Sequence, residues 1–137
     1  MMNINSKVRY GLRTMIEIAL QKNNKGIFQK DIAKNQIISE KYLDQIISSL
    51  KASDLISKTN EGYVLSKSQN NISIYDIYKS FEPELYIVQC LKKSTVCNGC
   101  NSLNCESSNK LWKQLNTIIV EFMKTNTLEN IVKDHKK

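Results

Sequence analysis

The order of periodic segments in the first half of the chain constrains its fold most. Apolar residues recur at helical spacing over 7–21 and 40–53, and a shorter helical segment, 29–34, lies between them. Residues 35–38 are expected to form a turn, and Ser39 has the side chain of an N-cap for the helix that follows. Two helices joined by a turn, with another helix before them, predict a helix-turn-helix.

Two short β-prone runs, 55–59 and 63–66, come next, and the Asn-Glu-Gly sequence at 60–62 between them is typical of a tight turn. A further helix is predicted over 72–81, ahead of Pro83. A hairpin directly after a helix-turn-helix is typical of a wing. The predicted fold class is therefore mainly α with a small β-wing, a winged helix-turn-helix.

From about Ser108 the chain is predicted to be helical again, with a broad apolar stripe along about four turns. The stripe consists of Leu111, Trp112, Leu115, Ile118, Ile119, Phe122 and Met123. So much apolar surface requires a partner, and we expect this long C-terminal helix to pair with its copy in a second subunit, forming a homodimer. The alternative is that the helix folds back on its own domain.

All four cysteines of the chain lie close together, at Cys90, Cys97, Cys100 and Cys105. Disulfides among them would close only one loop on itself, and the neighbouring Asn, Ser and Gly residues form turns that let several sulfurs converge. We interpret the four as metal ligands, for an iron-sulfur cluster or, alternatively, for zinc. A further alternative is a set of metal-free thiols that sense oxidants by forming disulfides.

The charge balance suits a polyanionic partner. The formal net charge is +7, and residues 1–67 hold 11 Lys and Arg against 6 Asp and Glu, compared with 9 against 7 in residues 68–137. Such a basic excess is typical of proteins that contact nucleic-acid phosphates. Because no signal peptide or membrane-spanning run is recognisable, we expect a cytoplasmic protein without a membrane partner, where reducing conditions disfavour structural disulfides.

The sequence offers little support for an enzyme. Cys97 and Cys100 have the spacing of a redox pair, but no βαβ unit would place them at a helix N-terminus. We recognise no glycine-rich phosphate loop and no histidine to serve a cysteine nucleophile. We therefore expect no catalysis, with a thiol oxidoreductase as the remaining alternative.

Nearly the whole chain resembles the IscR, NsrR and CymR type of bacterial winged-helix regulators, many of which carry iron-sulfur clusters. The resemblance rests on the order and spacing of segments 6–13, 32–46, 50–56, 62–65 and 74–77, and on Cys105 shortly before Leu111 and Trp112. It implies a dimeric DNA-binding regulator of transcription. The expected division is then a winged DNA-binding domain over 1–82, a cluster-holding cysteine loop over 83–107, and a dimerisation helix with a basic tail over 108–137.

The resemblance also implies that two recognition helices read two half-sites about one DNA turn apart. Ser39, Lys41, Tyr42, Asp44 and Gln45 would then face the major groove or the phosphates beside it. Gln45 has the chemistry to pair with adenine, and Asp44 to accept a hydrogen bond from cytosine. The alternatives are that Tyr42 belongs to the core and that Asp44 is a solvated charge.

Further phosphate contacts are expected from the first two helices, at Lys7, Arg9, Tyr10, Arg13, Gln29 and Lys30. The hairpin departs from the usual family pattern, because it lacks the arginine followed by several glycines. Lys58 remains a phosphate candidate there, whereas Glu61 would repel a phosphate.

In cluster-binding relatives, three cysteines of this loop ligate iron and the fourth ligand varies. Cys90 and Cys105 match the outer pair, and either Cys97 or Cys100 matches the middle position. We expect all four sulfurs to be ligands, with Glu106 as a weaker oxygen candidate. The single histidine, at position 135, is expected to be solvated in the basic tail.

The resemblance further suggests how the cluster would control DNA binding. Oxygen, nitric oxide or iron scarcity would alter the cluster and change the shape of the cysteine loop. The spacing of the two recognition helices, and with it the operator affinity, would then shift.

Overall fold

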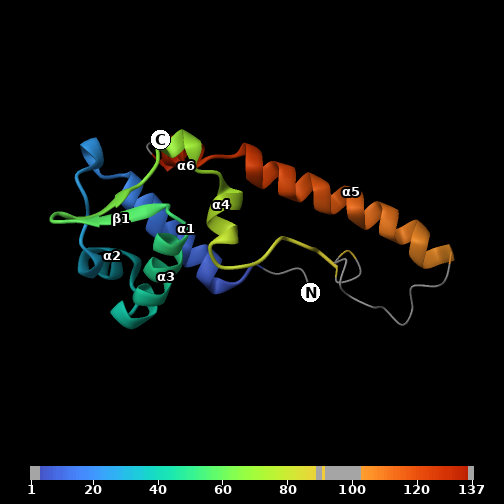
Figure 1. The fold of residues 1–137 in the computed structure, drawn as a ribbon, viewed down its shortest axis with the longest axis horizontal. Coiled ribbons are helices and arrows are strands. Elements are labelled where there is room, and N and C mark those ends of the chain that lie inside the picture. The colour runs from blue at the N-terminus through green and yellow to red at the C-terminus, as the bar shows by residue number, and fades with distance from the viewer. Residues whose placement is uncertain (1–3, 89–90, 92–102, 136–137) are drawn as a thin grey trace.

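The structure is a computed structural model that describes residues 4–88, 91 and 103–135 (Figure 1). Its elements in chain order are α1 (Ser6–Ala19), η1 (Lys22–Asn24), α2 (Gln29–Gln36), α3 (Glu40–Ala52), β1 (Ile56–Thr59), β2 (Gly62–Leu65), η2 (Gln69–Asn71), α4 (Ile74–Lys79), α5 (Leu103–Thr125) and α6 (Leu128–His135). This order confirms the predicted class, mainly helical with one two-stranded wing.

Polar side chains cap α1 and α3, two helices of the winged part. Asn5 accepts a hydrogen bond from the Val8 N–H at 2.9 Å and begins α1. Ser39 accepts the Tyr42 N–H at 3.1 Å and begins α3, which confirms the N-cap predicted at this position. These caps satisfy backbone donors that a helix leaves without partners in its first turn.

One hydrophobic core joins all parts of the winged domain. Its fully buried side chains come from α1, α2, α3, α4 and α6, and from the segments that follow α3 and η2. They include Met15, Ile18, Ile32, Leu43, Ile46, Leu50, Ile72 and Ile77. The apolar periodicity of the sequence predicts most of these positions, because a helix buries the face on which apolar residues recur.

The wing is an antiparallel hairpin that is also tied to the segment before α2. Residues 56–59 pair with residues 62–65. Ile27 and Tyr63 exchange two backbone hydrogen bonds, at 3.1 and 2.8 Å. Gly62 has a φ of +111°, and a Cβ there would lie 2.4 Å from the Ile27 backbone, so only glycine fits.

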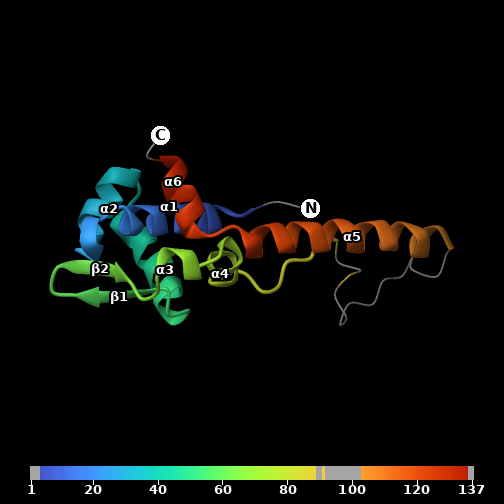
Figure 2. The same ribbon diagram turned by 90° about the horizontal axis from the view of Figure 1, so that it is seen from above.

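The C-terminal part differs from the expectation of one helix and a tail. α5 begins at Leu103, about one turn before the predicted start, and its first half extends away from the winged domain (Figures 1 and 2). The expected basic tail instead contains α6, which packs on α1. Leu128 and Val132 are one helical turn apart, and both are buried in the main core, which explains why this segment is helical.

A second, smaller hydrophobic cluster fixes the last half of α5 on α4. Met123 is buried there beside Val8, Tyr75, Tyr78 and Leu85. Burial raises the pKa of the Tyr78 phenol, and the nearby Glu82 carboxylate raises it further. One face of α5 therefore does fold back on its own domain.

Candidate nucleic-acid interface

The third helix presents a polar face to solvent. Leu43, Ile46 and Leu50 are completely buried on its inner side. The outer side carries the exposed residues Glu40, Lys41, Asp44, Gln45 and Ser48. Hydrogen-bonding side chains at spacings of one, four and five residues lie on one helix face, so this surface can approach base edges in a groove.

Tyr42 lies at the edge of this face and is only partly buried. Its ring meets the Tyr10 ring of α1 edge to face, with 5.8 Å between the ring centroids, and its hydroxyl lies 3.1 Å from the Ser6 hydroxyl. The Arg13 guanidinium lies 4.9 Å from the Tyr10 ring centroid. Cation–π and aromatic contacts of this kind orient side chains, so Arg13 is held next to the start of α3.

A second link joins α3 to the start of α2. The side-chain amide of Gln29 donates to the Asp44 carboxylate and to the Glu40 backbone oxygen, the latter at 3.4 Å. Asp44 is thus an exposed carboxylate that accepts a hydrogen bond from another side chain of the protein.

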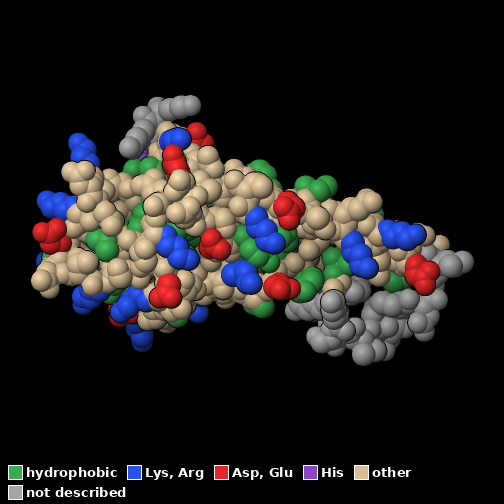
Figure 3. All heavy atoms as spheres, turned by 45° about the horizontal axis from the view of Figure 1, so that its top comes forward, with side chains coloured by type: hydrophobic (Ala, Val, Ile, Leu, Met, Phe, Trp, Pro, Cys, Tyr) green, Lys and Arg blue, Asp and Glu red, His purple; other side chains and the backbone are tan. Residues whose placement is uncertain are grey.

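The remaining basic candidates lie on separate elements of the same domain. Lys7 and Arg9 are exposed in the first turn of α1, Lys30 is exposed in the first turn of α2, and Lys58 is exposed on β1. In Figure 3, basic and acidic side chains are interspersed over the face in view, which therefore carries no patch of a single sign.

Two polar residues beside this surface were not predicted from the sequence. Ser48 shares the exposed face of α3 because it lies four residues after Asp44, a spacing that the sequence alone could have revealed. Ser6 lies beside Tyr42 through a contact between α1 and α3. That contact depends on how the two helices cross, which has no local sequence signal.

The predicted cysteine ligands fall largely outside the described residues. Cys90, Cys97 and Cys100 belong to that part of the chain, and Cys105 is partly buried in the first turn of α5. Among the residues that the structure describes, no three His, Cys, Asp or Glu side chains converge as metal ligands would. The alternative oxygen ligand Glu106 is exposed, as is His135.

The Asn116 side chain of α5 hydrogen-bonds the segment that leads toward the cysteines. Asn116 accepts the Ile87 N–H at 2.8 Å and donates to the Leu85 backbone oxygen at 3.1 Å. Asn116 follows Cys105 by eleven residues, which is close to three helical turns, so the two lie on the same face of α5. Residues 85–87 and Cys105 therefore lie on the same side of α5, about three helical turns apart.

Another side of α5 carries an exposed apolar seam. Leu111, Leu115, Ile118 and Phe122 recur at intervals of four, three and four residues and are 36–66% exposed. Figure 3 shows apolar groups reaching the surface over this arm of the molecule. The interval pattern is that of helices that pair along their length.

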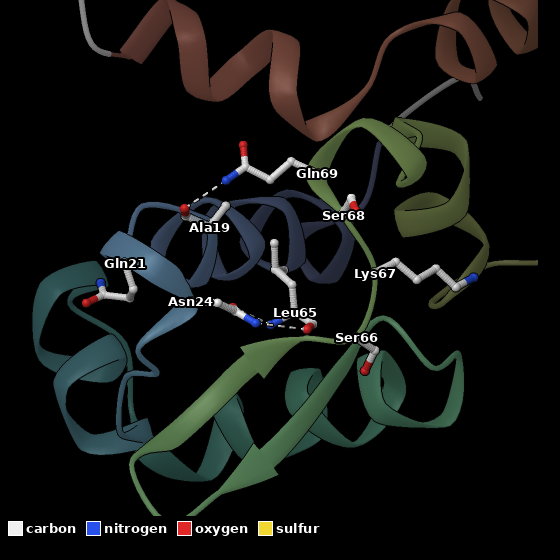
Figure 4. Close-up of a pocket in the computed structure, with 8 residues that line it drawn as sticks. All are labelled: Ala19, Gln21, Asn24, Leu65, Ser66, Lys67, Ser68 and Gln69. Carbon is white, nitrogen blue, oxygen red and sulfur yellow. Dashed lines mark hydrogen bonds between the residues drawn. The ribbon is translucent and has the colours of Figure 1, made fainter.

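Among the clefts on the described part of the chain, two lie where its elements join. The first, of about 400 Å³, lies between the end of α1, η1 and the segment after β2 (Figure 4). Its amide side chains bind the protein itself: Gln69 donates to the Ala19 backbone oxygen at 3.0 Å, and Asn24 bonds both backbone groups of Leu65. This cleft joins the wing to α1.

The second cleft, of about 480 Å³, lies between α4, residues 84–86 and α5. Lys79 and Lys124 approach the Tyr75 ring from these two helices, with 5.8 and 5.3 Å from each ammonium to the ring centroid. Glu84 accepts a hydrogen bond from Tyr86, which raises the pKa of the Tyr86 phenol. These contacts add to the attachment of α5 to the winged domain.

Comparison with known families gives one match over nearly the full chain. The model of the Rrf2 family, described as an iron-dependent transcriptional regulator, matches residues 4–134. The HTH-type transcriptional regulator IscR of Pectobacterium carotovorum is 28% identical over 134 residues, which cover 96% of this chain and 79% of that protein.

Solved structures agree with this match. The global cysteine regulator CymR of B. subtilis superposes with a TM-score of 0.82 at 28% identity, covering 97% of this chain and 98% of that one. The oxidized form of Staphylococcus aureus CymR gives a TM-score of 0.74 at 25% identity, with 96% of each chain covered. T. potens IscR gives 0.75 at 24% identity over 98% of this chain and 88% of that one, and so supports the fold.

Among the residues that the structure describes, no helix is both long enough and apolar enough to cross a bilayer.

Proposed function

Because this chain belongs to the Rrf2 family of transcriptional regulators, whose members bind DNA, we propose that it is a homodimer whose operator affinity is controlled by an iron-sulfur cluster on its four cysteines. The observation that carries the DNA-binding part is the exposed polar face of α3, held by capping and side-chain contacts to both neighbouring helices.

Within this proposal, α3 enters the major groove. Asp44 and Gln45 reach the base edges, whereas Lys41 and Ser39 contact phosphates. The Ser39 hydroxyl already accepts the Tyr42 N–H and still has its hydrogen to donate to a phosphate. Lys7, Arg9 and Arg13 contact the backbone from α1, with Tyr10 orienting Arg13. Lys30 and Lys58 add phosphate contacts from α2 and from the wing.

Dimerisation would occur through the apolar seam of α5. The seam residues are exposed and lie on a different side of α5 from Met123, so the same helix can be fixed to its own domain and to a partner at once. Two paired α5 helices would set the distance between two recognition helices. That distance must match the helical repeat of the operator.

The four thiols would hold the cluster between the winged domain and α5. Thiolate sulfur is the common ligand of iron-sulfur clusters, and four cysteines satisfy an all-cysteine site. Asn116 holds residues 85–87 on the same side of α5 as Cys105, about three helical turns further along the helix. A bound cluster would supply a redox-sensitive or iron-sensitive centre at this junction.

A thiol-based switch is the second candidate, and the likeness to CymR favours it. One of the matching CymR structures is an oxidized form, and the B. subtilis protein is a cysteine regulator. The same four thiols would then act by reversible oxidation, with no metal bound. Structural zinc on these sulfurs is a third arrangement with the same DNA-binding fold.

An absorption spectrum of protein purified without oxygen separates these candidates, with iron, sulfide and zinc quantified per chain. A cluster gives visible charge-transfer bands with matching iron and sulfide, and Cys105→Ala should remove most of that absorbance. Operator affinity should then differ between the holo and apo forms at fixed salt. Equal affinities would contradict control by the cluster, and a colourless protein after attempted reconstitution would leave zinc or thiol oxidation.

A further inference from the structure

Gln29 lies where a phosphate contact is expected, but its amide hydrogens are already donated. The Gln29 Nε2 group gives one hydrogen bond to an Asp44 carboxylate oxygen and one to the Glu40 backbone oxygen, both on α3. A primary amide has two hydrogens, so none remains for a phosphate oxygen. The remaining side-chain atom, Oε1, is an acceptor and has no attraction for a phosphate.

Asp44 gains a defined position from this contact. Its second carboxylate oxygen accepts no hydrogen bond from any residue in the described part of the chain, and the side chain is exposed. DNA phosphates repel a carboxylate, and hydrogen bonds from a base amino group and from a neutral donor on the other oxygen offset part of that repulsion. The bond also limits the side-chain rotamers of Asp44 before DNA arrives.

We propose that Gln29 is a positioning residue for sequence reading, and that it presents Asp44 to a base amino group in the major groove. This inference rests on the proposed DNA-binding role of α3. It assigns Gln29 to operator specificity, whereas a phosphate contact would assign it to general affinity for DNA.

A double-mutant cycle tests the assignment. An operator is first selected from random DNA with the wild-type protein. Dissociation constants are then measured at several salt concentrations for wild type, Gln29→Met, Asp44→Ala and the double variant, on the operator and on unrelated DNA of the same length. Methionine keeps the length of the side chain but cannot donate a hydrogen bond.

We expect Gln29→Met to weaken operator binding about fivefold to tenfold and to leave binding to unrelated DNA unchanged within about twofold. In the Asp44→Ala background the same substitution should change operator binding by less than about twofold. The salt dependence should match that of wild type, because no phosphate contact is lost.

Lys30→Met is the matched control, since it alters the adjacent exposed residue in the same helical turn. It should weaken both DNAs similarly and reduce the salt slope by about one. The proposal is overturned if Gln29→Met behaves like this control, or if its effect persists undiminished in the Asp44→Ala background. Failure of the wild-type protein to select any sequence would instead count against the proposed DNA-binding role of α3.

Discussion

Ile37 combines two unfavourable features at one residue, in the turn between α2 and α3. Its backbone is left-handed, with φ 55° and ψ 53°, and its side chain is 90% exposed. A β-branched residue in this conformation is strained, and the exposed side chain offers no burial in return.

Replacing Ile37 with glycine should therefore stabilise the protein. We expect Ile37→Gly to raise the free energy of unfolding by about 0.5–1 kcal/mol, because relief of strain exceeds the added chain entropy of glycine. Urea unfolding measures the change. Ile38→Gly is the matched control, because Ile38 packs against the core and lacks a positive φ. It should lower stability by about 2 kcal/mol or more. If Ile37→Gly instead lowers the free energy of unfolding, the left-handed backbone at Ile37 does not cost the protein stability.

At the scale of elements, the structure differs most from the sequence-based prediction at the C-terminus, where α6 forms in place of the expected basic tail. The three helices and hairpin of the first half follow from apolar periodicity, caps and turn residues, all of which are local signals. α6 was missed because its short apolar pattern lies among charged residues. Its stability comes from Leu128 and Val132 entering a core formed by distant segments.

The site shows the same division. Ser39 and the exposed positions of α3 follow from capping chemistry and helical spacing, which a sequence displays directly. The contacts from Gln29 to Asp44 and from Tyr42 to Ser6 depend on the crossing of separate helices. No pattern along the chain encodes such a crossing.

α6 should accordingly contribute to the stability of the winged domain. Leu128 is fully buried, and the Leu128 N–H also bonds the Ile72 backbone oxygen at 2.9 Å. We expect Leu128→Ala to lower the free energy of unfolding by about 2–5 kcal/mol, through lost burial and the cavity left behind. Leu111→Ala removes the same atoms from an exposed site and is the control, measured by urea unfolding at a concentration where the protein is monomeric. Equal effects of the two would show that α6 does not belong to the core.

At the scale of the molecule, α5 has two distinct faces. Its inner face fixes the helix to α4 through Met123 and to residues 85–87 through Asn116. Its outer face is the seam of exposed apolar residues. A change at the inner face would be transmitted to the partner through one rigid helix, which is how a signal at the cysteines could reach the spacing of two DNA-reading helices.

Substitutions at two neighbouring residues of α5 can test the proposed dimer. Ile118 lies in the seam and is 64% exposed, whereas Thr117 is exposed on another side of the same helix. A charge in an apolar helix pair is costly, so Ile118→Glu should shift the protein to monomers and weaken operator binding by tenfold or more, at about micromolar concentration. Thr117→Glu adds the same charge one residue away and should leave the dimer intact. Light scattering with size exclusion measures the mass of each variant. If Ile118→Glu remains dimeric, subunits pair through another surface, and the spacing of the recognition helices is not set by this seam.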